Sequence, residues 1–247
     1  MNDSFEPKII RLETVKSTND YLQEKINELI MYNKVIVIAS VQTGGKGYSN
    51  NKWESEPGKN LTISYLFRPD FLMPEKQFLI SKFISLGIID FLELYLLDLH
   101  IKWPNDIYAN DKKIAGILIE NSIIGDELYY SVAGIGINVN QEIFSQNLIN
   151  PISMKNITGF EYSLDDCLDI LMTMIENRYN TLKEAPDIID KDYLTYLYRY
   201  NIFHPFRFEN KWFNGKITGL DSSGRLVIEK ENGVVNIYGF KEVEYII

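Results

Sequence analysis

The sequence predicts an α+β fold in two parts: a domain with a mixed sheet over residues 1–197, then a small SH3-like β-barrel over residues 198–247. Strand-like and helix-like segments alternate through the first part, which is typical of a sheet covered by helices. From Phe206 onward, turn residues divide the chain into four or five short strands, the pattern of a small barrel. The length of 247 residues, against roughly 150 for a typical domain, also favours one large and one small domain.

Hydrophobic spacing and turn residues define the first elements of the larger domain. Strands are expected over residues 9–15, 35–39 and 60–67. Ser17 can cap a helix over about residues 19–31, because its hydroxyl can accept from the first free backbone N–H groups. Residues 42–59 begin with a stretch that holds three glycines and almost no large apolar side chain, so this segment is predicted to be a long loop.

The rest of the chain continues the alternation of helices and strands. Apolar side chains recur at helical spacing along residues 80–97, which predicts a buried helix, and further helices are expected over 164–182 and 188–200. Strands are expected over residues 101–103, 113–124 and 128–140, the last two joined as a hairpin at Gly125 and Asp126. In the barrel, turns are predicted at residues 214–215, 221–224 and 232–233.

Composition and charge exclude several classes of protein. The net charge is −9, so nucleic acid is not expected as a partner, because phosphate binding needs a positive face. One cysteine and two histidines exclude a disulfide framework, a Cys-rich zinc module and a three-His metal centre, and Cys167 is predicted to be a core thiol. The N-terminal residues lack signal-peptide features and no uncharged run reaches the ~18 residues of a membrane span. A cytoplasmic protein without membrane contact is expected.

A glycine-rich stretch from Gln42 to Trp53 is the most informative segment of the sequence. Its glycines could let backbone N–H groups converge on an anion, with Lys46 adding a charge for phosphate or carboxylate. It is not a Walker A loop, because Ser40 stands where the first glycine is needed and Gly47 where Ser or Thr should follow the lysine. A flexible surface loop is the alternative interpretation of this composition.

A second segment runs from Lys102 to Asp106 and is followed by Lys113, which opens an apolar strand. A lysine that is partly desolvated on a rigid strand is well placed to stabilise developing negative charge. The alternative is a plain charged turn over residues 111–113. From these residues alone, both interpretations stay open.

Two more segments carry polar side chains or open backbone. Gly134 and Gly136 alternate in a strand and leave room against its backbone, and Asn138 could offer a donor and an acceptor to a base edge. Tight strand packing would explain the same glycines. The fourth segment, Ser17-Thr18-Asn19, is also explained as a helix cap.

In order and spacing, these four segments resemble the motifs of the biotin protein ligase family, the biotin–[acetyl-CoA-carboxylase or biotin carboxyl carrier protein] ligases. The matching residues are Ser17-Thr18-Asn19, the adenylate loop Gly45–Asn51 with Gln42 before it and Trp53 after it, Lys102-Trp103-Pro104-Asn105-Asp106, Lys113–Leu118 and Gly134–Asn138. The motifs cover about residues 8–140, and the C-terminal β-domain fits the family's architecture without a distinctive motif.

The resemblance implies an ATP- and Mg²⁺-dependent ligase that makes biotinyl-5′-AMP and transfers biotin to a lysine of a biotin carboxyl carrier protein or a biotin-dependent carboxylase subunit. It implies Lys113, Lys46 and Asp106 as catalytic residues, with Asp106 near magnesium or the acceptor lysine. The biotin site would comprise Ser17, Thr18, Asn19, Gln42, Gly45, Lys46, Gly47, Tyr48, Lys113, Gly116 and Gly134. The nucleotide site would comprise Lys46, Trp53, Asn105 and Asn138.

The chain also departs from the family's common pattern. The loop has Lys46, Tyr48 and Asn51 where the pattern has arginines, and lysine cannot form a bidentate fork with phosphate. Only about eight residues precede the first strand, so the monofunctional type without a DNA-binding domain is expected.

Two alternatives accompany this interpretation: a lipoate or octanoate protein ligase or transferase, and a non-catalytic biotin or nucleotide sensor. Ser17 and Thr18 with Gln42 suit a polar ureido ring better than an alkyl chain. The retained Lys113 argues against a sensor.

Overall fold

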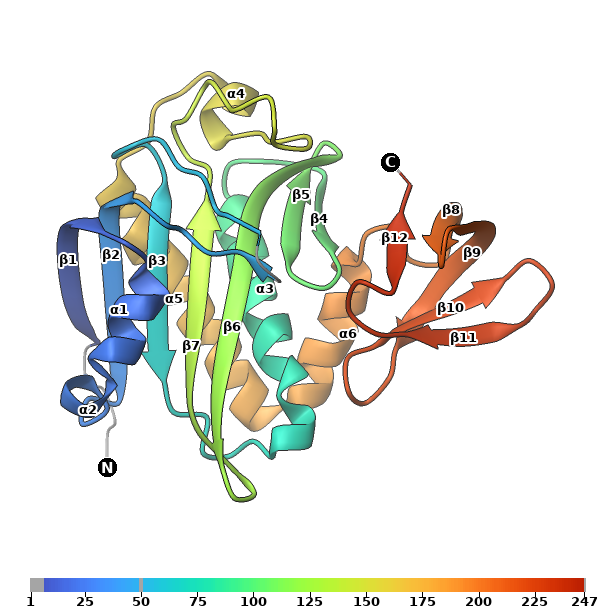
Figure 1. The fold of residues 1–247 in the computed structure, drawn as a ribbon, viewed down its shortest axis with the longest axis horizontal. Helices are drawn as coiled ribbons and strands as arrows, with labels where there is room; N and C mark the ends of the chain where they lie inside the picture. The colour runs from blue at the N-terminus through green and yellow to red at the C-terminus, as the bar shows by residue number, and fades with distance from the viewer. Residues whose placement is uncertain (1–6, 49–50, 247) are drawn as a thin grey trace.

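The computed structural model describes residues 7–48 and 51–246, and it contains two sheets (Figure 1). The larger sheet has seven strands in the order β1-β2-β3-β7-β6-β5-β4. β1 pairs parallel with β2 and every other neighbouring pair is antiparallel, so the predicted mixed sheet is confirmed. Its strands are β1 (Lys8–Val15), β2 (Lys34–Gln42), β3 (Leu61–Phe67), β4 (Leu99–Lys102), β5 (Asp106–Ala109), β6 (Lys112–Ile124) and β7 (Glu127–Ile137).

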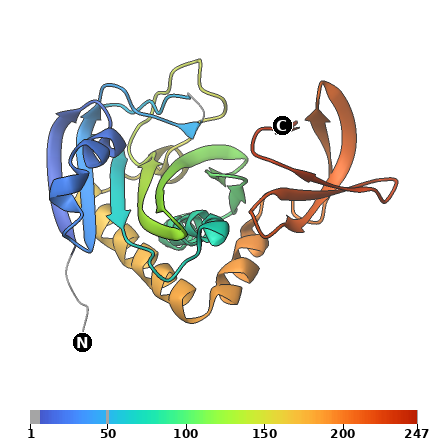
Figure 2. The ribbon, with the colours of Figure 1, turned by 60° about the horizontal axis from the view of Figure 1, so that its bottom comes forward.

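Helices cover both faces of this sheet (Figure 2). They are α1 (Thr18–Glu24), α2 (Ile26–Leu29), α3 (Phe78–Leu92), α4 (Met154–Thr158), α5 (Leu164–Glu184) and α6 (Pro186–Tyr196), with a 3₁₀ turn η2 (Pro74–Lys76) before α3. α3, α5 and α6 pack in the main core, whereas α1 and α2 close a smaller apolar cluster on the opposite face. No helix in the described part of the chain is long and apolar enough to cross a membrane.

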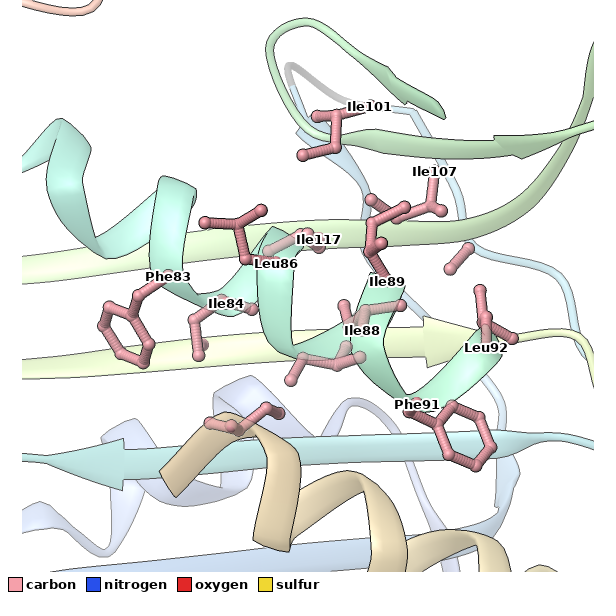
Figure 3. Close-up of a cluster of buried hydrophobic side chains, with 14 of the residues drawn as sticks. Phe83, Ile84, Leu86, Ile88, Ile89, Phe91, Leu92, Ile101, Ile107 and Ile117 are labelled. Atoms are coloured by element: carbon pink, nitrogen blue, oxygen red, sulfur yellow. The ribbon is translucent and has the colours of Figure 1, made fainter. Parts of the chain in front are cut away.

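α3 is the centre of the core (Figure 3). Thirteen of its residues are buried, because it lies between the sheet on one side and α5 and α6 on the other. Gly87 allows α5 to approach closely, since a Cβ there would lie 2.8 Å from the Ile175 Cα. Lys82 is buried beside α6 and its Nζ lies 2.6 Å from Oδ1 of Asp190. Cys167 is buried in the same core, as predicted, and burial raises its pKa to about 11.

Helix boundaries differ from prediction at three places. The helix expected over 19–31 is two short helices, because the backbone of Lys25 leaves helical geometry between them. The helix expected over 80–97 ends at Leu92, and Asp98 in the left-handed conformation then turns the chain into β4. The helix expected over 188–200 ends at Tyr196, because Leu197 is extended.

The second sheet has five antiparallel strands in the order β11-β10-β9-β8-β12. These are β8 (Phe203–Phe208), β9 (Lys211–Leu220), β10 (Leu226–Lys230), β11 (Val235–Tyr238) and β12 (Val243–Tyr245). The sheet fits the predicted small barrel broadly but is not closed. The turn predicted at Asn214-Gly215 is wrong: both lie inside β9, and the chain turns at Glu209 and Asn210, which have positive φ angles.

Candidate functional site

A cavity of about 370 Å³ lies where the four predicted segments meet the second sheet. Its walls come from the start of α1, the glycine-rich loop, the β4–β5 turn, β6, β7 and β12. Among the residues predicted for the site, it is lined by Ser17, Thr18, Asn19, Gln42, Lys46, Gly47, Tyr48, Trp53, Asn105, Asp106, Lys113, Gly116 and Gly134. The fold therefore brings together residues that are up to 117 positions apart (134 − 17). Gly45 and Asn138 do not line this cavity.

One end of the cavity is a polar corner formed by Ser17, Thr18 and Gln42. The Gln42 Oε1 accepts hydrogen bonds from the Thr18 backbone N–H (2.8 Å) and from the Thr18 hydroxyl (3.1 Å). The Ser17 hydroxyl caps α1 by accepting from the Asp20 N–H at 3.4 Å, while Ser17 itself is only 2% exposed. The two interpretations of this segment are thus compatible, because a helix cap forms part of the cavity wall.

Asn19 fixes this corner to the sheet. Its Nδ2 donates to Oε2 of Glu120 at 2.8 Å, and its Oδ1 accepts from the Ser64 hydroxyl. A Cβ added at Gly134 would lie 2.5 Å from the Asn19 Oδ1, so the missing side chain of Gly134 makes room for Asn19.

The Trp53 indole lies across a glycine platform on the two central strands. Gly116 of β6 and Gly136 of β7 are direct cross-strand partners, and each faces the indole. A Cβ at Gly136 would overlap the ring, and one at Gly116 would lie 3.2 Å from it. The space predicted beside the alternate glycines is therefore filled by Trp53 and Asn19 of this chain, as the interpretation of tight packing expected.

We expect Gly136→Ala to lower the free energy of unfolding by about 1–3 kcal/mol, because the new methyl group overlaps Trp53. Urea unfolding measures this, with Gly116→Ala as the matched and milder change. In a Trp53→Ala background the Gly136→Ala penalty should largely disappear. An unchanged midpoint for Gly136→Ala in the native background would contradict the contact.

The β4–β5 turn and β6 supply the charged part of the cavity. The Lys113 Nζ lies 2.6 Å from Oδ1 of Asp106 and 5.9 Å from the centroid of the Trp53 ring. The Asn105 Nδ2 donates to the Ile117 carbonyl at 2.7 Å, which ties the turn to β6. Lys113 thus lies on a strand, as its sequence position predicted, and the turn that carries Asp106 is tied to the same strand.

Lys102 is a second cation in this wall that was not assigned to the site from sequence. Its Nζ donates to the Tyr108 hydroxyl at 2.9 Å and lies 5.4 Å from the centroid of the Tyr245 ring. Burial lowers the pKa of Lys102, and the nearby Asp106 opposes that shift. The sequence offered a signal, because Lys102 begins the motif that ends in Asp106.

The glycine-rich loop lies over the cavity and is held by its own backbone. The Trp53 N–H donates to the Gly45 carbonyl at 3.0 Å, and a Cβ at Gly45 would lie 2.5 Å from the Trp53 carbonyl oxygen. Gly45 therefore shapes the loop without lining the cavity. The Lys46 Nζ pairs with Asp20, whose hydrogen bond raises the pKa of Lys46. Two residues of the matched loop motif, Ser49 and Asn50, lie outside the described residues.

The side chain of Asn138 is buried and bonded within the protein. Its Nδ2 donates to the Ile152 carbonyl at 3.0 Å. It lines a neighbouring cavity of about 430 Å³ that shares Lys113 and Trp53 with the first. Asn138 therefore lines the second cavity and not the one that holds the polar corner.

The second sheet completes the cavity with residues that no motif predicted, namely Lys241, Val243, Glu244 and Tyr245. The carboxylate of Glu244 accepts from the Arg207 Nε at 3.0 Å. No cluster of three or more His, Cys, Asp or Glu residues able to hold a metal ion is found in residues 7–48 and 51–246.

Solved structures with the same architecture include biotin protein ligases. The Aquifex aeolicus enzyme in complex with biotin and ATP has a TM-score of 0.79 and 24% identity, covering 97% of this chain and 99% of that chain. The Leishmania major enzyme with biotinyl-5-AMP has a TM-score of 0.65 at 22% identity, covering 94% and 99%. The chain therefore shares the fold of these structures.

Sequence comparison gives the family. Residues 12–138 match the biotin/lipoate A/B protein ligase family, and residues 206–241 match the biotin protein ligase C-terminal domain. The bifunctional ligase/repressor BirA of Bacillus subtilis is 30% identical over 221 residues, covering 82% of this chain and 64% of its own length. The human biotin–protein ligase is 31% identical over 214 residues, covering 81% and 29%. The chain belongs to the biotin/lipoate A/B protein ligase family.

Proposed function

We propose that this chain activates biotin with ATP and transfers it to a lysine of a biotin carboxyl carrier protein or a biotin-dependent carboxylase subunit. Relatives across the family are described as biotin–protein ligases, including one from Paracoccus denitrificans that acts on acetyl-CoA carboxylase. The observation that supports this proposal most directly is that one cavity is lined by both the polar corner at Gln42 and Lys113, which pairs with Asp106.

The proposed reaction has two steps. A carboxylate oxygen of biotin attacks the α-phosphorus of ATP, the bond to the bridging oxygen breaks, and pyrophosphate leaves. Biotinyl-5′-AMP remains in the cavity, where the loop shields the mixed anhydride from water. The ε-amine of the acceptor lysine, deprotonated as it attacks, then forms an amide with the biotin carbonyl carbon, and AMP leaves.

In the first step, Lys113 offsets the negative charge that builds up on the α-phosphate. Lys113 is prepared for this because its strand fixes the backbone and Asp106 holds the ammonium group at 2.6 Å. Mg²⁺ bound to the ATP phosphates would neutralise part of their charge, with Asp106 as the proposed protein ligand. Lys46, on the loop over the cavity, would add a second positive charge. Its ammonium group, which pairs with Asp20 in the structure, could pair with the substrate instead.

The remaining residue roles are proposed from which residues line the cavity. The proposed biotin contacts are Ser17, Thr18, Asn19, Gln42, Gly47, Tyr48, Gly116 and Gly134, with Trp53 and Asn105 on the nucleotide. Gly45 and Asn138 would act indirectly, because neither lines the first cavity. We further propose residues 1–197 as the catalytic domain and 198–247 as the C-terminal domain.

The setting of the reaction is also proposed. Consumption of ATP and the single, buried Cys167 support action in the cytoplasm. The net charge of −9 does not favour nucleic acid or an anionic membrane as a partner.

Pyrophosphate release from ATP, measured with biotin, lipoate or octanoate as the acid, tests the proposed substrate. We expect release with biotin and little with the other two, because their chains lack the ureido group that the Gln42 corner would bind. Preference for lipoate or octanoate would assign the chain to the other branch of its family. Binding of biotin without release from ATP would indicate a sensor.

A further inference from the structure

The turn between β11 and β12, residues 239–242, contacts the glycine-rich loop. The Tyr48 ring meets the Phe240 ring edge to face, with centroids 5.9 Å apart. The Nζ of Lys241 lies 5.5 Å from the centroid of the same Tyr48 ring. Two consecutive residues of this turn therefore contact one side chain of the loop that covers the cavity.

Phe240 also contacts the motif turn on the other wall of the cavity. Its ring centroid lies 5.2 Å from that of Trp103 and 5.8 Å from that of Phe78 at the start of α3. Trp103 is 3% exposed, and its Nε1 donates to the Gly224 carbonyl at 2.9 Å. One aromatic ring thus touches both Tyr48 of the glycine-rich loop and Trp103 of the turn that carries Asn105 and Asp106.

The β11–β12 turn is itself internally braced. The Gly239 N–H donates to Oε2 of Glu242 at 2.6 Å, and Lys241 adopts the left-handed conformation with φ of 65°. Phe240 nevertheless keeps 38% of its surface exposed. The braced turn therefore holds a partly exposed ring beside the glycine-rich loop.

We propose that Phe240 is a positioning residue that holds the glycine-rich loop over the cavity by packing against Tyr48. This inference rests on the proposed function, because the loop then determines how long biotinyl-5′-AMP stays bound. The loop has Tyr48 where the family's common pattern has an arginine, so a ring contact with Phe240 takes part in holding the loop over the cavity. The C-terminal sheet would in this way control retention of the adenylate.

The test is the dissociation rate of synthetic biotinyl-5′-AMP from the protein. The complex is mixed, in the absence of ATP, with an excess of biotin and of a competing adenylate analogue. Release is followed by tryptophan fluorescence. We expect Phe240→Ala and Tyr48→Ala each to release the adenylate about fivefold faster, which is the scale of one aromatic pair. The double variant should release it no faster than Tyr48→Ala alone, because Phe240 acts on the loop through Tyr48. Phe240→Tyr should stay near the wild type because it keeps the ring.

Ile237→Ala is the matched control, since Ile237 lies on β11 just before the turn, is 48% exposed and does not line the cavity. Unchanged release from Phe240→Ala, or additive effects in the double variant, would overturn the proposal. A general effect of removing an apolar side chain from this sheet would instead speed release in Ile237→Ala as well. Failure of the wild type to bind biotinyl-5′-AMP would contradict the proposed function and is seen before any variant is compared.

Discussion

Lys113→Ala is expected to lower the rate of adenylate formation by about a hundredfold or more while biotin affinity stays within about tenfold. In the proposed reaction the Lys113 charge would matter most when negative charge builds up on the α-phosphate. In the structure its ammonium lies 2.6 Å from Asp106 and lines both cavities that share Trp53. Single-turnover pyrophosphate release and equilibrium biotin binding measure the two quantities separately.

Lys112→Ala is the control for this variant, because the neighbouring Lys112 is exposed and lines neither cavity. Asp106→Asn combined with Lys113→Ala tests whether an unpaired carboxylate, rather than the lost lysine, slows the reaction. We expect the double variant to remain slow. Equal losses of biotin affinity and of rate in Lys113→Ala would contradict a transition-state role.

Gln42→Leu is expected to weaken biotin binding by about a hundredfold. The Oε1 atom of Gln42 accepts from both the backbone N–H and the hydroxyl of Thr18, and leucine leaves both donors without this acceptor. If biotin hydrogen-bonds this corner as proposed, a polar group left unpaired in the complex costs about 1–3 kcal/mol, which is up to about a hundredfold in affinity. Calorimetric titration with biotin measures the change. Gln42→Glu keeps an acceptor oxygen and should lose less affinity.

Gln23→Leu is the matched control for the Gln42 variant. Gln23 lies on α1 a few residues after Thr18, and its Oε1 accepts from the Tyr130 hydroxyl at 2.9 Å outside the cavity. Its replacement should leave biotin affinity unchanged. Wild-type affinity in Gln42→Leu would show that the polar corner does not hold the ligand.

The sequence predicted those features that depend on neighbouring residues. The apolar run at β2 and the Gly125-Asp126 hairpin between β6 and β7 were correct because strand alternation and turn chemistry are local. Gly134 was recognised as open backbone, and the structure identifies Asn19 as the group that uses the space. The residue that fills such a space is set by long-range packing, which no spacing rule gives.

Other features depended on contacts between distant segments. Lys102 joins the cavity through Tyr108 and Tyr245, and Tyr245 reaches it only because β12 packs beside the motif turn. Asn138 lies in the predicted motif, yet its amide is committed to the Ile152 carbonyl. Asn214-Gly215 has turn chemistry, but Gly215 is needed inside β9, where a Cβ would lie 2.5 Å from the Ile228 side chain.

The most direct measurement is a competition for activation in a single tube. The purified chain is mixed with ATP, Mg²⁺ and equal concentrations of biotin, lipoate and octanoate, and the acyl adenylates retained by the protein are identified by mass spectrometry. The geometry of the Gln42 corner and Lys113 predicts biotinyl-5′-AMP as the dominant adenylate, strongly reduced in Lys113→Ala. A dominant lipoyl or octanoyl adenylate, or no adenylate from an enzyme that binds both biotin and ATP, would contradict the proposed function.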